Sequence, residues 1–399
     1  MIMRLLETPW HVFGILLIIT LGLAMAILVG RRFGLRRRRT SFLYFWHTGF
    51  CLLYVLYVLE NGGDALGYYQ EALFFNEWKL GTAAVSVIAA PFVHWLGLPF
   101  FGVNLVFNFF GVVGLLAFYG GLRSELVDRP RWVRRLAYLV VLLPSVSFWS
   151  SGLGKDSLAF MATGLAFWAA LNLRSRATLM CVAIGTMLVV RPHMAGILLL
   201  AVGASVTFGS EVSLKRRLVF ALLILSASVI LIPFALNYAG LGSADSVSEV
   251  NDYIEQRQGY NQVGGGSIDI SSMSPLMRAF TYLFRPLPFE AHSFAALAAS
   301  LDNLLLLLLA VLGCWGILSR RKTPSRPSRI FMWCYVVACL GILSMTTANL
   351  GISVRQKWMF VPMLVYLLLS VTGRSRDRAA LANGLPTPVV DRNVASWNS

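Results

Sequence analysis

The chain contains a series of apolar stretches that each run for close to 20 residues. A helix that crosses about 30 Å of hydrocarbon at about 1.5 Å per residue needs roughly that length. Of the 399 residues, 57% are hydrophobic and 13% are charged, with a mean hydropathy of +0.69. Soluble domains are about a quarter charged. The sequence therefore predicts an all-α polytopic membrane protein.

Eleven segments match this pattern, and we expect each to cross the membrane as a helix. The first resembles a signal peptide, but a block of arginines follows it instead of a small-residue cleavage site, so we expect it to be retained. The two segments on either side of Arg191 are short. The eleven predicted spans are residues 10–30, 41–60, 100–122, 136–152, 156–173, 177–190, 194–209, 217–238, 299–318, 330–350 and 357–373.

The positive charge lies in alternate loops, which together hold 25 of the 34 Lys and Arg residues. By the positive-inside rule these loops face the cytoplasm. The pattern predicts a cytoplasmic (inner) membrane protein with its N-terminus outside and its C-terminus cytoplasmic. It also assigns the net charge of +16 to topology, so no nucleic-acid partner is expected. Residues 1–373 then form one transmembrane domain, and residues 374–399 form a short disordered cytoplasmic tail.

Two long outer loops are expected at about 61–99 and 239–298. In the first, Val85 to Leu98 is apolar but interrupted by Pro91 and His94, which is typical of an interfacial helix or a re-entrant segment. In the second, Gly264 to Ser267 predicts a flexible stretch, and Met277 to Ala298 a second interfacial segment.

Asp64 follows the second predicted span, and Tyr68 and Tyr69 follow it closely. A carboxylate at the membrane surface can act as general base for an acceptor hydroxyl, and the tyrosines can offer a sugar-stacking face. The alternative is a solvated acid with interfacial tyrosines.

Two further groups of charges lie at the expected outer surface. Lys155 and Asp156 occupy the tip between two spans, where Lys155 can pair with a lipid phosphate or simply reach the interface. Arg191-Pro192-His193 separates the two short spans, so we expect Arg191 and His193 in a cavity open to the outside. A guanidinium there needs a carboxylate or phosphate partner. The alternative is a structural ion pair between Arg191 and either Asp64 or Asp156.

Arg285 lies in the second long loop, and Arg355-Gln356-Lys357 ends the turn before the last span. Together with Lys155 and Arg191, these cations can form an anion site. Singly, each is an ordinary interfacial anchor. No metal cluster is visible in the sequence, and the five cysteines lack zinc-site spacing. No cofactor is required, although Asp64 can contribute to a divalent cation site.

This layout resembles the GT-C superfamily of membrane glycosyltransferases and the related O-antigen and exopolysaccharide polymerases. The resemblance covers roughly residues 41–372, as a pattern of topology and sparse polar positions. It implies a polyprenyl-(di)phosphate sugar donor, a glycan or lipid-linked acceptor, Asp64 as the base or an acceptor-binding residue, and Arg191, Arg355 and Lys357 as phosphate-binding cations. Ala65 stands where many such enzymes have a second acid. The chain also ends in a short tail, where many such enzymes have a folded outer domain. Both departures favour the polymerase-like branch.

We therefore predict catalytic roles for Asp64, Arg191 and His193. Substrate-binding roles are predicted for the other outer polar residues, namely Tyr68, Tyr69, Lys155, Asp156, Arg285, Arg355, Gln356 and Lys357. Two alternatives remain open. One is a transporter or flippase for a lipid-linked saccharide, which the missing internal repeat disfavours. The other is a non-catalytic subunit of a polysaccharide export complex.

Overall fold

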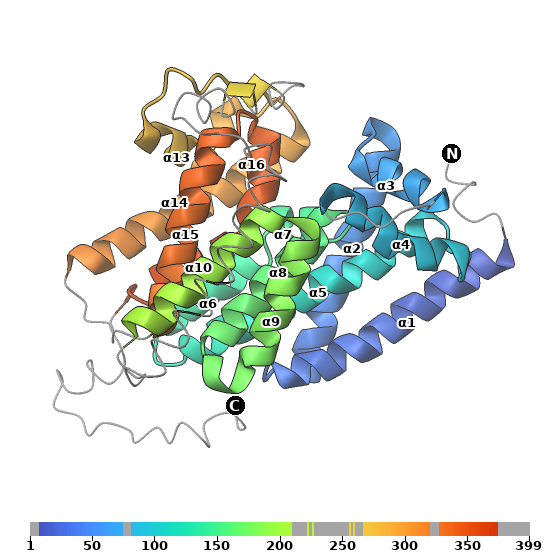
Figure 1. The fold of residues 1–399 in the computed structure, drawn as a ribbon, viewed down its shortest axis with the longest axis horizontal. Helices are drawn as coiled ribbons and strands as arrows, with labels where there is room; N and C mark the ends of the chain where they lie inside the picture. The colour runs from blue at the N-terminus through green and yellow to red at the C-terminus, as the bar shows by residue number, and fades with distance from the viewer. Residues whose placement is uncertain are drawn as a thin grey trace.

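The computed structural model describes residues 8–74, 81–209, 222, 226, 255–256, 258–259, 266–319 and 327–373. These residues are helical apart from turns and one isolated bridge between Ser267 and Asn349 (Figure 1). Six of their helices are long and apolar enough to cross a membrane. The number is seven if the bent pair Leu350–Met359 and Val361–Leu369, at 68°, counts as one span. The expected all-helical class is confirmed for the described residues, and these apolar helices are compatible with a multi-pass membrane protein.

The first two long helices are α1 (Pro9–Arg32) and α2 (Arg37–Asn61), which pack against each other and against α5 (Phe100–Glu125) (Figure 1). Helix α2 ends at two glycines with positive φ, Gly62 at 76° and Gly63 at 152°. Side chains with a Cβ are strained there, so the glycines permit a sharp turn. Helix α3 (Asp64–Leu73) begins directly after that turn.

The apolar part of the first expected outer loop is helical in the structure, while its place in the interface stays a prediction. It forms a 3-10 turn, η2 (Gly81–Ala83), that continues into α4 (Ala84–His94) with Pro91 inside the helix. Helix α4 packs against α3, so this region forms a small helical layer beside the ends of α2 and α5 (Figure 1).

Helices α5 and α8 (Lys155–Ala170) pack extensively against each other. A Cβ added to Gly164 would lie 2.4 Å from the carbonyl oxygen of Gly114, closer than real Cβ contacts. Small residues allow membrane helices to approach this closely. The pair fixes the start of α8, where Lys155 and Asp156 lie, against the central helix.

The prediction of one continuous span over 136–152 is wrong. The structure places α6 (Arg131–Val141) and α7 (Pro144–Ser150) there, with a break at residues 142–143. The break has a local cause, because proline disfavours helical geometry in the preceding residue and lacks the N–H that a helix interior needs. Pro144 instead occupies the first turn of α7.

Helices α9 (Leu173–Val190) and α10 (Pro192–Phe208) match the two short predicted spans. Arg191 separates them with φ −146° and ψ 75°, outside helical geometry. Pro192 explains this break in the same way, since it suits the first turn of a helix and not its interior. Helix α10 packs against α15.

The C-terminal part contains α13 (Pro275–Phe284), η3 (Pro288–Glu290), α14 (Phe294–Leu318) and α15 (Pro327–Thr346). After α15 come α16 (Leu350–Gln356), η4 (Lys357–Met359) and α17 (Val361–Leu369). Helix α14 begins at residue 294, so the end of the expected interfacial segment belongs to this long helix. The predicted span 217–238 apart from Leu222 and Ser226, residues 264–265 and the tail 374–399 lie outside the described residues.

Candidate functional site

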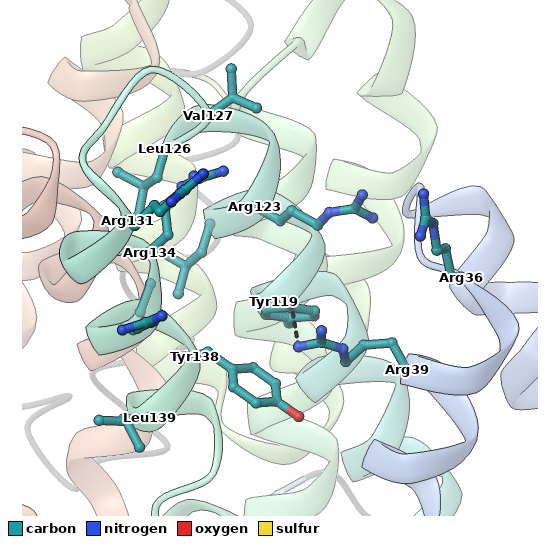
Figure 2. A pocket seen from close by; sticks show the side chains of 13 residues that line it. Arg36, Arg39, Tyr119, Arg123, Leu126, Val127, Arg131, Arg134, Tyr138 and Leu139 are labelled. Carbon is teal, nitrogen blue, oxygen red and sulfur yellow. Dashed lines mark hydrogen bonds between the residues drawn. The ribbon is translucent and has the colours of Figure 1, made fainter. Parts of the chain in front are cut away.

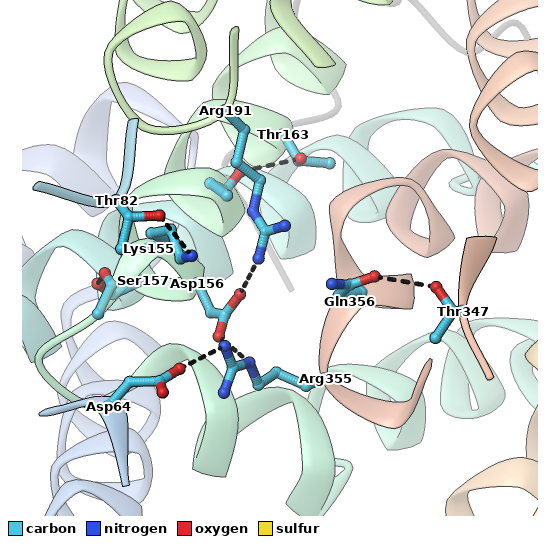
Figure 3. A network of polar contacts seen from close by, with 12 residues as sticks. Asp64, Thr82, Lys155, Asp156, Ser157, Thr163, Arg191, Thr347, Arg355 and Gln356 are labelled. Atoms are coloured by element: carbon cyan, nitrogen blue, oxygen red, sulfur yellow. Dashed lines mark hydrogen bonds and ion pairs between the residues drawn. The ribbon is translucent and has the colours of Figure 1, made fainter. Parts of the chain in front are cut away.

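Four charged side chains from distant parts of the chain meet beside the start of α8 (Figure 3). We call them the Asp–Arg network. Asp64 is the first residue of α3, Asp156 lies in the first turn of α8, Arg191 separates α9 from α10, and Arg355 lies in the last turn of α16. The sequence predicted all four as site residues.

Asp156 is the central member of the network. Its Oδ1 accepts a hydrogen bond of 2.8 Å from Nη2 of Arg191. Its Oδ2 lies 2.6 Å from Nε of Arg355, in an ion pair without hydrogen-bond geometry. Arg355 also donates from Nη2 to Oδ2 of Asp64 at 3.0 Å. One guanidinium therefore joins the two carboxylates, and one carboxylate joins the two guanidiniums.

Exposure increases along the network from Arg191 to Asp64. The side chains of Arg191 and Asp156 are 8% and 13% exposed, that of Arg355 is 24% exposed, and that of Asp64 is 55% exposed. Removing one partner of a buried ion pair leaves an uncompensated charge. The Arg191–Asp156 contact is thus the structural part of the network, and Asp64 is the part that solvent or a substrate can reach.

Local structure fixes both carboxylates. Each lies at a helix N-terminus, where the helix dipole favours negative charge. The turn before α8 is held by the side chain of Asn104, whose Oδ1 accepts from the backbone N–H of Leu153 at 2.8 Å. His47 adds a second tie, since its ring nitrogens contact Asn108 at 2.6 Å and Ser150 at 2.9 Å. These hydrogen bonds connect α2, α5 and α7, and Ser150 lines the same small space as Asp156 and Arg355.

Arg191 is buried, with 7% of the residue exposed, so the expectation that it lines an open cavity is not met in this structure. The space beside Asp156 and Arg355 has a volume of about 10 Å³. That volume holds about one water molecule. The Nε of Arg191 is also buried and makes no hydrogen bond to the described residues. Binding a phosphate here requires at least one ion pair to open.

Three other predicted residues lie near the network without joining it. Lys155 donates from Nζ to Oγ1 of Thr82 at 3.1 Å, which ties α8 to η2. Tyr68 is buried, so its ring offers no stacking face here; burial, with Asp64 nearby, raises the pKa of its hydroxyl. Tyr69 donates to the carbonyl of Leu98 at 3.1 Å and is half-buried.

Lys357 and Gln356 follow Arg355 in sequence, but their side chains contact other residues and are not part of the network. Lys357 is fully buried, and its ammonium group contacts Oδ1 of Asn303 and the carbonyl of Leu283. Gln356 accepts a hydrogen bond from Thr347. The sequence analysis missed Asn303 and its neighbour Asp302, whose carboxylate accepts from the backbone N–H of Ser145 at 2.7 Å. The signal for both was an acid and an amide within an otherwise apolar segment.

Arg285 forms its ion pair outside the network. Arg285 donates from Nε to Oε1 of Glu290 at 2.8 Å, and Glu290 also accepts from the backbone N–H of Leu287. Arg285 therefore stabilises the turn between α13 and α14. His193 lies in the first turn of α10 and is half-buried.

Among the described residues, no group of three or more His, Cys, Asp or Glu side chains is placed to hold a metal ion. The involvement of a divalent cation through Asp64 stays a prediction. Comparison with protein-family models, with curated proteins and with solved structures finds no match to this chain.

Proposed function

We propose that this protein is a membrane glycosyltransferase or polysaccharide polymerase. It transfers a sugar or oligosaccharide from a polyprenyl-(di)phosphate carrier to a glycan or lipid-linked acceptor. The reaction takes place on the outer face of the cytoplasmic membrane. The observation that carries the proposal is the Asp–Arg network, in which the exposed carboxylate of Asp64 contacts Arg355, and Arg355 shares the carboxylate of Asp156 with Arg191.

The proposed topology has about eleven spans, with the N-terminus outside and the C-terminus in the cytoplasm. It rests on the alternate basic loops and on the apolar helices of the described residues. In this topology α3, the start of α8 and the end of α16 face outward, and the α1–α2 turn faces the cytoplasm.

In the proposed reaction, the acceptor hydroxyl oxygen attacks the anomeric carbon of the donor sugar and forms a new glycosidic bond. The bond from that carbon to the phosphate oxygen breaks, and the (di)phosphate leaves on its polyprenyl chain. The carboxylate of Asp64 takes the hydroxyl proton. Arg355 and Arg191 stabilise the negative charge that develops on the phosphate. This electrostatic stabilisation is strongest in a site that contains little water.

Arg355 links these roles because it contacts both carboxylates. When a phosphate enters, Arg355 can exchange Asp64 for a phosphate oxygen while it keeps Asp156. That exchange frees Asp64 to act as the base. Arg355 lies at the edge of the buried part of the network. Its side chain is 24% exposed, and its guanidinium carbon lies 5.9 Å from the ring centre of Trp149.

The test uses three single variants in the host cell: Asp64→Asn, Arg191→Gln and Arg355→Gln. For each variant, the amount of this protein in the membrane and the amount of surface polysaccharide are measured. The proposal predicts loss of polysaccharide at a normal level of the Asp64 variant. Asp269→Asn, at another exposed acid that lies outside the network, is the matched control. Normal polysaccharide in all three variants would exclude the transferase.

The same variants separate the alternative functions. A flippase variant accumulates lipid-linked saccharide on the cytoplasmic side, whereas a transferase variant accumulates it on the outer side. A non-catalytic subunit tolerates Asp64→Asn with no change in product. Topology is tested with Gln70→Cys and Ser175→Cys in a cysteine-free background, since both positions are exposed. Labelling of position 70 from outside and of 175 from inside is expected; the reverse pattern would overturn the orientation.

A further inference from the structure

A second polar site lies at the opposite end of α2 from Asp64. The start of α2, the end of α5 and the start of α6 surround a cavity of about 790 Å³ (Figure 2). Among the described residues that line it, none is an aspartate or glutamate, and six are arginines: Arg36, Arg39, Arg123, Arg131, Arg134 and Arg135. We call it the arginine cavity.

Several of these side chains are held in place by aromatic and backbone groups. Arg39 donates to the hydroxyl of Tyr119 at 3.2 Å, and its guanidinium carbon lies 4.5 Å from the ring centre of Tyr138. The two tyrosine rings contact each other at 5.3 Å. Arg123 donates to the carbonyl of Gly34 at 2.7 Å. A positioned guanidinium loses less side-chain entropy when it binds a phosphate.

The arginines form two groups on different sides of the cavity. Arg36 immediately precedes α2, Arg39 lies in its first turn, and both lie close to Arg123 of α5, while the other three come from α6 (Figure 2). Topology accounts for arginines in the two cytoplasmic loops that contain them, but topology alone does not require them to share a cavity. Two separated cationic groups fit a ligand with two separated phosphates better than one compact phosphate.

The apolar residues at the cavity indicate that the ligand is a lipid. Val127 and Leu139 line it and are 42% and 51% exposed. Trp132, beside Arg131, is 45% exposed, as in interfacial anchors. Helix α6 thus presents arginines and apolar side chains side by side at the ends of two long helices. A soluble phosphate needs no such apolar surface, whereas the acyl chains of a lipid do.

We propose that the arginine cavity binds the headgroup of an anionic phospholipid with two phosphate diesters, of the cardiolipin class. One phosphate lies between Arg36, Arg39 and Arg123, and the other lies against the arginines of α6. Basic pockets between transmembrane helices bind such headgroups through charge-assisted hydrogen bonds. The proposal does not depend on the transferase function, because the cavity shares no residue with the Asp–Arg network.

The experiment uses the full-length protein in detergent and native mass spectrometry with four added ligands. These are a cardiolipin, a phosphatidylglycerol, a polyprenyl diphosphate and inorganic pyrophosphate. Arg39→Ala combined with Arg131→Ala removes one arginine from each group. Arg31→Ala combined with Arg32→Ala is the matched control, because it removes the same charge from exposed residues outside the cavity near the same end of α2.

The expected result is tightest binding of cardiolipin to the wild type, weakened roughly fivefold per cavity arginine removed. The control variant should bind cardiolipin as the wild type does. Equal weakening in both variants would overturn the proposal, since net charge alone would then explain binding. Tighter binding of polyprenyl diphosphate or pyrophosphate would overturn the choice of lipid. If the double variant does not fold, the single variant Arg131→Ala, at an exposed residue, is measured in its place. The same outcomes then support or overturn the proposal.

Discussion

Asp64 and Arg355 are 291 positions apart in the sequence, and Nη2 of Arg355 lies 3.0 Å from Oδ2 of Asp64. This contact joins the first short helix after α2 to the bent helix pair near the C-terminus. The same guanidinium contacts Asp156, which in turn binds Arg191. A network built from four distant segments forms only when the whole helical bundle is assembled, so its side chains report on the fold as well as on the proposed chemistry.

Asp156→Asn should destabilise the protein, because it removes the shared counter-charge of two arginines. Breaking a buried ion pair from one side costs about 3 kcal/mol. The measurement is thermal unfolding of the purified protein in detergent. Asp64→Asn is the comparison, since an exposed pair contributes less than about 1 kcal/mol. Equal losses of stability for the two variants would contradict the exposure gradient of the network.

Asp64→Asn should reduce transfer activity about 100-fold or more if Asp64 is the general base. Asn keeps the size of the side chain and its contact with Arg355 but cannot take up a proton. The assay is product formation by the purified protein with a polyprenyl-linked donor. Glu71→Gln serves as a control acid on the same helix, where the carboxylate accepts a hydrogen bond from Ser86. An active Asp64→Asn variant would remove Asp64 from the mechanism.

Gly164→Val should weaken the packing of α8 on α5. A Cβ at Gly164 lies 2.4 Å from the carbonyl oxygen of Gly114, and overpacking of this kind costs about 1–3 kcal/mol or more. Gly185→Val is the matched control, because a Cβ at Gly185 in α9 meets no atom within 4 Å. Thermal unfolding should show a large loss for the first variant and a small change for the second. Similar stability in both would contradict the close approach of the helices.

The turn between α13 and α14 should lose stability in acid. The side-chain hydrogen bond from Arg285 lowers the pKa of Glu290 below its ordinary value of 4.5. A depressed pKa means that the ionised form stabilises the folded state, so the contribution is present above pH 4.5 and is lost as the pH falls through the folded pKa. Glu290→Gln should therefore lower the melting temperature at pH 7 and have no effect well below pH 4. Glu60→Gln, at an exposed acid, is the control. A stability difference for Glu290→Gln that does not change with pH would rule out this ion pair as its cause.

The helical class and the four members of the Asp–Arg network could be predicted from sequence, because hydropathy and unusual charge are local properties. Which charges meet is not local. Arg355 and Lys357 are two residues apart, yet the 3-10 turn after Gln356 directs Lys357 to Asn303 and away from the network. The helix break before Pro144 could be predicted from that proline alone. The continuous apolar run around it instead favoured a single uninterrupted span. His47, Asn104 and Asn108 lie within apolar helices. Their hydrogen-bond partners could not be predicted from sequence, because helix packing determines them.

The four side chains of the Asp–Arg network carry two positive and two negative charges. Their sum is zero, so the network itself exerts little long-range attraction on an anion. An incoming phosphate must therefore compete with a carboxylate that is already in place. Asp64 is the carboxylate with room to move, since it is the most exposed member. In the proposed reaction, anion affinity at this site is then set by how readily the α2–α3 turn at Gly62 and Gly63 lets Asp64 withdraw. Substitutions at those glycines should change the affinity for the proposed donor without changing any charge.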